Sequence, residues 1–85
     1  VHGGGYAEFC TMDERSALPI PSHWSYEYAA AIPKNFMTAD ETLFTQGNLV
    51  KGESVLIHAG GSGVGTASIQ LAKHVGAKIF VTAGT

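Results

Sequence analysis

The sequence predicts an α/β fold in which two neighbouring parallel strands are joined by a helix. Three features of residues 54–83 support this prediction. Val55–Ile57 is a short, uninterrupted apolar run, typical of a strand that is covered on both faces. Small and apolar residues then recur at helical spacing over 64–75, and Gly76 is well placed to end that helix. A second strand is expected over 78–83, which completes a strand–helix–strand unit.

Composition narrows the class of protein. The 85 residues are 45% hydrophobic and 14% charged, with a formal net charge of −2, which is ordinary for a globular protein. No run of basic residues exists, so the electrostatic footprint of a nucleic-acid-binding protein is missing. Glycines and polar residues interrupt the most apolar stretch, which argues against a membrane span. Because Cys10 is the only cysteine, no internal disulfide can form, and a reducing, cytoplasmic setting is expected.

The ends of the chain resemble cuts in a longer sequence. Val1 opens on glycines without an initiator Met, and Thr85 follows directly after the second expected strand. A sheet buried on both faces also normally needs a longer chain than this one. We therefore expect an internal segment of a larger protein.

Before this unit the sequence predicts one strand and an extended connector. Tyr6–Met12 is rich in strand-forming residues and follows a glycine run, so a strand is expected there. The prolines of Leu18–Pro21 lack a backbone donor, which excludes a helix or a central strand.

Two helices are expected between the connector and the first strand of the unit. Ser25 has the side-chain chemistry of an N-cap for a helix over 26–32. Pro33 should end or kink that helix. A further helix is predicted over 34–46, with Gly47 at its C′ position.

The glycine-rich loop between strand and helix has the chemistry of a phosphate site. The first N–H groups of a helix lack partners within it and, with the helix dipole, attract an anion. In the glycine spacing typical of dinucleotide-binding loops, Gly60 is expected to supply the turn and Gly65 the close helix–strand contact. Ser62 occupies the middle position, and Gly63 beside it can restore the close approach. A merely flexible loop is the alternative, but the surrounding strand–helix–strand context favours a pyrophosphate site.

The residues after the second strand bear on the choice of cofactor. NAD-selective domains place an acid about 20 residues past the loop, on the ribose 2′-hydroxyl. Here the segment is Ala83–Thr85, without an acid. Because a carboxylate would repel a 2′-phosphate, its absence favours NADPH.

Four motifs in order carry a resemblance to a known family. They are GGGYAEF at 3–9, AAAIP at 29–33, FMTA at 36–39, and the run over 55–85. Together they resemble the zinc-free quinone oxidoreductase branch of the medium-chain dehydrogenase/reductase superfamily. Ser62 in place of the middle glycine also occurs within that branch.

The resemblance implies the organisation and activity of the whole protein. Residues 1–33 match the end of a GroES-like catalytic domain, and residues 34–85 match the start of a Rossmann domain that binds NADPH. Family members transfer hydride from NADPH to quinones or conjugated carbonyls, and commonly form dimers. We therefore expect an NADPH-dependent quinone oxidoreductase that is a homodimer at full length, with a small-molecule substrate and neither a nucleic-acid nor a membrane partner.

The resemblance also assigns site residues, all of them cofactor contacts. Thr38 matches the threonine near the nicotinamide and phosphates. Ser62, Gly63 and Val64 match the loop around the pyrophosphate, and Gly84 matches the position beside the adenosine ribose. No catalytic residue is nominated, because reduction of a quinone needs no obligatory side-chain acid.

A metal site is not expected. Zinc-dependent members of the superfamily place a cysteine ligand four residues before the family threonine, where this chain has Lys34. An ammonium group cannot replace a thiolate, and Cys10 lies in no ligand pattern. The four histidines share no metal-ligand spacing. His58 follows the first strand of the unit, but a packed or solvent-facing role is favoured over catalysis.

Two alternatives to quinone reduction stay open at this point. An enoyl reductase of fatty-acid or polyketide synthesis would carry a very similar glycine loop. A non-catalytic NADPH-binding protein is the second alternative, because the same family includes lens crystallins. The substrate distinguishes these alternatives, and the sequence over 1–85 says little about it.

Overall fold

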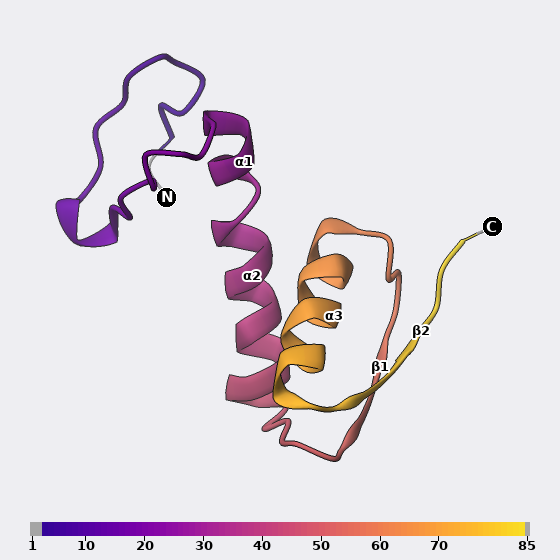
Figure 1. Ribbon diagram of the computed structural model, residues 1–85. Coiled ribbons are helices and arrows are strands. Elements are labelled where there is room, and N and C mark those ends of the chain that lie inside the picture. Colours follow the sequence, from indigo (N-terminus) through magenta and orange to yellow (C-terminus); the bar gives the residue numbers. More distant parts are fainter. Residues whose placement is uncertain (1–2, 85) are drawn as a thin grey trace.

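The computed structural model describes residues 3–84, so Val1, Thr85 and the first of the four histidines, His2, lie outside the described residues. Its elements form a layered arrangement, with α3 lying between α2 on one side and the two strands on the other (Figure 1). In chain order the elements are η1 (Glu14–Ser16), α1 (Tyr26–Ala30), α2 (Pro33–Asp40), η2 (Glu41–Gln46), β1 (Ser54–Ile57), α3 (Gly63–Val75) and β2 (Lys78–Val81).

The predicted strand–helix–strand unit is confirmed. β1 and β2 are parallel neighbours, in a register that runs from Ser54 opposite Lys78 to Ile57 opposite Val81. β2 ends at Val81, earlier than the position 83 expected from sequence. Ile57 is buried, because alternate strand residues face α3 across the sheet.

α3 begins and ends where its capping residues dictate. The hydroxyl oxygen of Ser62 accepts a hydrogen bond from the N–H of Gly65 at 3.0 Å, and Gly76 ends the helix with φ +83° in the left-handed region. Ala67 and Ala72 are buried, so the inner face of the helix is built of small side chains that let its neighbours approach closely. Val64, expected on this inner face, instead keeps 36% of its surface exposed.

The two helices expected before the strand–helix–strand unit both form, but the second helix begins at Pro33 rather than after it. Ser25 caps α1 as predicted, accepting the N–H of Tyr28 at 3.0 Å. The first helix ends at Ala30, and Pro33 is the first residue of α2, where its missing N–H costs no helical hydrogen bond. Pro33 therefore starts a helix as well as ending one.

The helix expected over 34–46 ends at Gln46, so Gly47 follows it as predicted, but without the left-handed backbone typical of a C′ glycine. α2 continues as the π-helical turn η2, and Gly47 keeps a right-handed backbone with φ −84°. Asn48 takes the left-handed conformation instead, with φ 52°. Gly47 is needed for another reason: a Cβ there would lie 2.8 Å from the carbonyl oxygens of Thr42 and Leu43.

The predicted strand at Tyr6–Met12 does not form. This segment belongs to a loop that extends away from the helices (Figure 1), and Tyr6 and Phe9 are almost fully exposed. A strand needs a neighbouring backbone to pair with, and none of residues 3–84 provides one here. Farther along the loop, Arg15 binds Asp13 at 2.7 Å and holds the pKa of that carboxyl below its ordinary value.

One face of the two-stranded sheet is left uncovered by residues 3–84. Leu56 and Phe80 are opposite each other in the register and are 58% and 54% exposed, because α3 covers only the other face. In the part of the chain that the structure describes, the buried apolar residues are few and mostly small; they are Ala29, Ala39, Leu43, Ile57, Ala67 and Ala72. Within residues 3–84, no helix is long and apolar enough to cross a membrane.

Candidate dinucleotide-binding site

The loop from β1 to α3 turns just after Ala59. Ala59 has φ 56°, in the left-handed region, and its carbonyl oxygen accepts the N–H of Ser62 at 3.0 Å. This bond closes a turn with Gly60 and Gly61 at its centre, so the expectation that Gly60 supplies the turn is confirmed. Gly60 is buried and also needs its small size, because a Cβ there would lie 3.1 Å from the Cβ of Val81 on β2.

The N–H groups of Gly61, Gly63 and Val64 are left without an acceptor among residues 3–84. All three residues are exposed and lie at or just before the start of the 13-residue helix α3. Free N–H groups at the positive end of a helix dipole make a site for an anion such as a pyrophosphate. Gly60 and Gly65 do not share this role, since their N–H groups donate to Thr82 and Ser62.

Two glycines show that one side of the loop is tightly packed and the other side is open. Gly65 is buried against the loop backbone: a Cβ there would overlap the carbonyl oxygen of Ala59 and lie 3.0 Å from the Cα of Gly60. The predicted close packing at Gly65 is present, but it is made against the loop that follows β1 rather than against the strand itself. By contrast, a Cβ at Gly61 would meet nothing within 4 Å, so the outer surface of the loop is open to a ligand. An open, donor-lined surface on a tightly packed turn is what a pyrophosphate requires.

Thr82, just beyond β2, ties this loop to the sheet. Its hydroxyl oxygen accepts the N–H of Ala59 at 3.2 Å and lies 3.1 Å from Nδ1 of His58. Its backbone N–H donates to Ile57 at 3.0 Å, and its carbonyl accepts from Gly60 at 2.8 Å. The role of Thr82 was not predicted; the available signal was a hydroxyl at the carboxyl end of a strand beside a glycine loop. The exposed His58 ring contacts Thr82, and its expected non-catalytic role stays a prediction.

The structure brings three of the five predicted site residues together. Ser62, Gly63 and Val64 form the first turn of α3 and its cap. Thr38 has an exposed side chain on the neighbouring helix α2, and Gly84 is exposed beyond the end of β2. Their cofactor contacts remain predictions.

α2 begins beside the loop, which places Asn35 at the start of α3. A Cβ at Gly63 would lie 2.6 Å from Nδ2 of Asn35, so the absence of a side chain at Gly63 makes room for this amide. Both residues line a depression of about 350 Å³. Its full lining is Tyr28, Ala31, Ile32, Asn35, Phe36, Gly63, Thr66 and Gln70.

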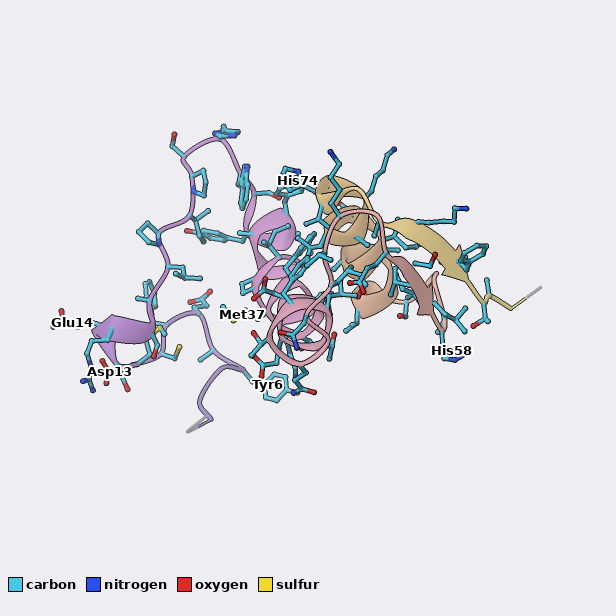
Figure 2. The ribbon with its side chains drawn as sticks, turned by 90° about the horizontal axis from the view of Figure 1, so that it is seen from below. Tyr6, Asp13, Glu14, Met37, His58 and His74 are labelled. Atoms are coloured by element: carbon cyan, nitrogen blue, oxygen red, sulfur yellow. The ribbon has the colours of Figure 1, made fainter. Side chains whose placement is uncertain are left out.

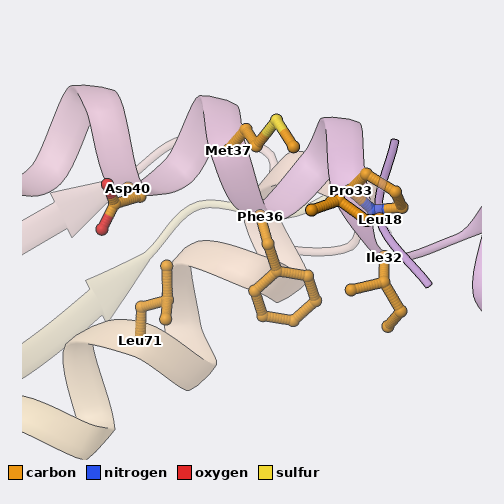
Figure 3. A pocket seen from close by; sticks show the side chains of 7 residues that line it. All are labelled: Leu18, Ile32, Pro33, Phe36, Met37, Asp40 and Leu71. Atoms are coloured by element: carbon orange, nitrogen blue, oxygen red, sulfur yellow. The ribbon is translucent and has the colours of Figure 1, made fainter. Parts of the chain in front are cut away.

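A second depression, also of about 350 Å³, is mainly apolar and lies along the contact between α2 and α3 (Figure 3). Phe36 projects from α2 toward α3, where Leu71 lies. Asp40 is the only charged residue of its lining. This depression contains none of the loop residues and offers no donors for a phosphate.

No metal site is apparent in the described part of the chain. Residues 3–84 contain no group of three or more His, Cys, Asp or Glu side chains that could hold an ion. His58 and His74 lie at separated places (Figure 2), and Cys10 and Lys34 are exposed. The expectation of a zinc-free enzyme rests on Lys34 and stays a prediction.

Comparison with curated proteins finds polyketide synthases. The chain is 49% identical over 71 residues to the spectinabilin polyketide synthase system protein NorB of Streptomyces orinoci, which covers 84% of this chain and 3% of that protein. It is 52% identical over 82 residues to the highly reducing polyketide synthase apmlA of Arthrinium phaeospermum, covering 96% of the chain and 3% of the synthase. The chain thus spans a small fraction of these relatives. No protein-family profile matches it.

Solved structures give a consistent result. The CurK enoyl reductase superposes with a TM-score of 0.77 at 42% identity, over 79% of this chain and 20% of that one. A human synaptic vesicle membrane protein VAT-1 homolog-like protein gives 0.76 at 46% identity, over 80% and 22%. A mycobacterial protein complexed with NADPH gives 0.74 at 33% identity, over 78% and 20%.

Proposed function

Since this chain belongs to the medium-chain dehydrogenase/reductase superfamily, we propose that it is the pyrophosphate-binding part of an NADPH-dependent enoyl reductase of the polyketide synthase type. Polyketide synthases and enoyl reductases recur among its relatives, which favours this alternative over the expected quinone oxidoreductase. The substrate is then an α,β-unsaturated acyl thioester, a conjugated carbonyl compound.

The free N–H groups of Gly61, Gly63 and Val64 carry the proposal. They are exposed at the start of α3 and face no acceptor among residues 3–84. A hydrogen bond to a charged oxygen is stronger than a hydrogen bond between two neutral groups. The three N–H groups together therefore provide both affinity and a fixed orientation for a pyrophosphate. The missing acid after β2, with Gly84 exposed there, leaves room for the 2′-phosphate of NADPH.

NADPH, when bound, supplies the hydride that reduces the conjugated double bond. The residues of this chain hold and orient that cofactor. Ser62 caps α3 and so keeps the N–H groups aimed outward. Gly65 allows helix and loop to pack tightly, and Thr38 is proposed to lie near the nicotinamide. The proton that completes the reduction of the double bond comes from solvent or from a group outside residues 3–84.

The proposal retains two further expectations for the whole protein. It is zinc-free, since Lys34 is exposed where zinc-dependent members have a cysteine. It also forms a homodimer, a state common in the family. Both follow from the resemblance of the sequence to known members.

The test uses the complete reading frame that contains this sequence. Fluorescence titration with NADPH and NADH should give tighter binding of NADPH. An α,β-unsaturated acyl thioester should then be reduced faster than 1,2-naphthoquinone under the same conditions. Faster reduction of the quinone would restore the quinone oxidoreductase function. Cofactor binding without turnover of either acceptor would favour a non-catalytic NADPH-binding protein.

A further inference from the structure

Thr82 holds the phosphate-binding loop through both its backbone and its side chain. The backbone contacts continue the pairing of β1 with β2, whereas the hydroxyl reaches the loop itself at His58 and Ala59. We propose that the Thr82 hydroxyl is a positioning group for the cofactor loop, fixing Ala59 so that the free N–H groups beyond it face the pyrophosphate. This inference rests on the proposed function, because it concerns the same loop and the same ligand.

The hydroxyl group can satisfy both of its side-chain partners at once. A threonine hydroxyl has one hydrogen to donate and two lone pairs to accept. Ala59 donates its N–H to the hydroxyl oxygen at 3.2 Å, which leaves the hydroxyl hydrogen for Nδ1 of His58 at 3.1 Å. No aliphatic side chain of the same shape can make either bond. The contribution of the hydroxyl is therefore separable from that of the strand pairing.

The hydroxyl acts at the residue where the turn of the loop begins. Ala59 is left-handed, with φ 56°, a conformation that residues with a Cβ rarely adopt. Its N–H is held by Thr82, and its carbonyl accepts the N–H of Ser62, the cap of α3. One side chain is thus connected through one strained residue to the helix start where the phosphate-binding N–H groups lie.

Three variants of the complete protein test this role. Thr82→Val removes the hydroxyl and keeps the branched shape, and Thr82→Ser keeps the hydroxyl. Thr42→Val is the matched control, because that hydroxyl donates to the carbonyls of Thr38 and Ala39 within the helices rather than to the loop. For each protein we would measure NADPH affinity by fluorescence titration, amide hydrogen exchange of Ala59 without cofactor, and the thermal midpoint.

We expect Thr82→Val to raise the Kd for NADPH about three- to tenfold and to speed Ala59 exchange by a similar factor, the loss expected of one or two hydrogen bonds. Thr82→Ser should stay close to the wild type, and Thr42→Val should change neither quantity. Wild-type affinity in Thr82→Val, or an equal loss in Thr42→Val, would overturn the inference and leave the proposed function intact. In the wild type, an Ala59 amide that exchanges as fast as an unstructured one would also overturn it. A wild-type protein that does not bind NADPH would instead overturn the proposed function.

Discussion

Replacing Gly65 with alanine probes the tight packing on which the phosphate loop depends. A Cβ at this position would overlap the carbonyl oxygen of Ala59 and lie 3.0 Å from both the Cα of Gly60 and the hydroxyl oxygen of Ser62. Two of these three neighbours are backbone atoms, which cannot rotate aside. α3 would therefore have to move away from the loop.

The expected loss of stability follows from two opposing effects. Forcing a methyl group into a packed site costs about 1–3 kcal/mol, and collision with backbone places this site at the upper end of that range. Alanine gains up to about 1 kcal/mol over glycine in a helix, although less in its first turn. We expect Gly65→Ala to lower the free energy of unfolding by about 2 kcal/mol. The same displacement should also weaken NADPH binding, because the N–H groups of the first turn move with the helix.

Urea denaturation of the complete domain that contains this chain gives the measurement. Gly61→Ala is the matched control, because a Cβ there would meet nothing within 4 Å and its backbone is not left-handed. The control should unfold at the wild-type urea concentration or slightly above it. If Gly65→Ala were as stable as Gly61→Ala, the packing argument would be refuted.

Three further predictions address the cap, the cofactor choice and the chain by itself. Ser62→Ala should lower the free energy of unfolding by about 1 kcal/mol through loss of the cap, as measured by thermal unfolding. Ser62→Asp should keep the cap but repel the pyrophosphate. Tight NADPH binding by Ser62→Asp would contradict a phosphate at this loop. Gly84→Asp, at an exposed site with nothing within 4 Å of an added Cβ, should shift the ratio of NADPH to NADH affinity toward NADH by about tenfold or more, by repulsion of the 2′-phosphate. An unchanged ratio of the two affinities would show that Gly84 does not lie beside the adenosine ribose. The 85-residue chain alone should melt without a cooperative calorimetric transition, because Leu56 and Phe80 leave one face of the sheet exposed to solvent. A sharp transition would show that the chain folds stably with this face exposed.

The strand–helix–strand unit was predictable because each of its boundaries has a local cause. An apolar run gives β1, helical periodicity with Ser62 and Gly76 at the ends gives α3, and the close contact at Gly65 follows from the glycine spacing. These signals lie within a few residues of the feature they specify. Local patterns therefore sufficed for the unit and for most of the phosphate loop.

The features that escaped prediction depend on contacts between segments distant in sequence. Gly60 lies in the turn as predicted, but its contact with Val81 on the next strand and the left-handed backbone of Ala59 were not predicted. The hydroxyl of Thr82 contacts Ala59 and His58, which are 23 and 24 positions earlier in the chain, and no local sequence pattern predicts these contacts. A strand at Tyr6–Met12 would need a pairing partner that residues 3–84 do not contain.

The central claim is that the N–H groups at the start of α3 bind the pyrophosphate of NADPH. Titration of the isotopically labelled complete domain with NADPH, followed by amide chemical shifts, tests it directly. We predict that the amide signals of Gly61, Gly63 and Val64 shift most among those of the loop and α3. Unchanged signals at all three positions, with saturable shifts elsewhere in the domain, would contradict the claim.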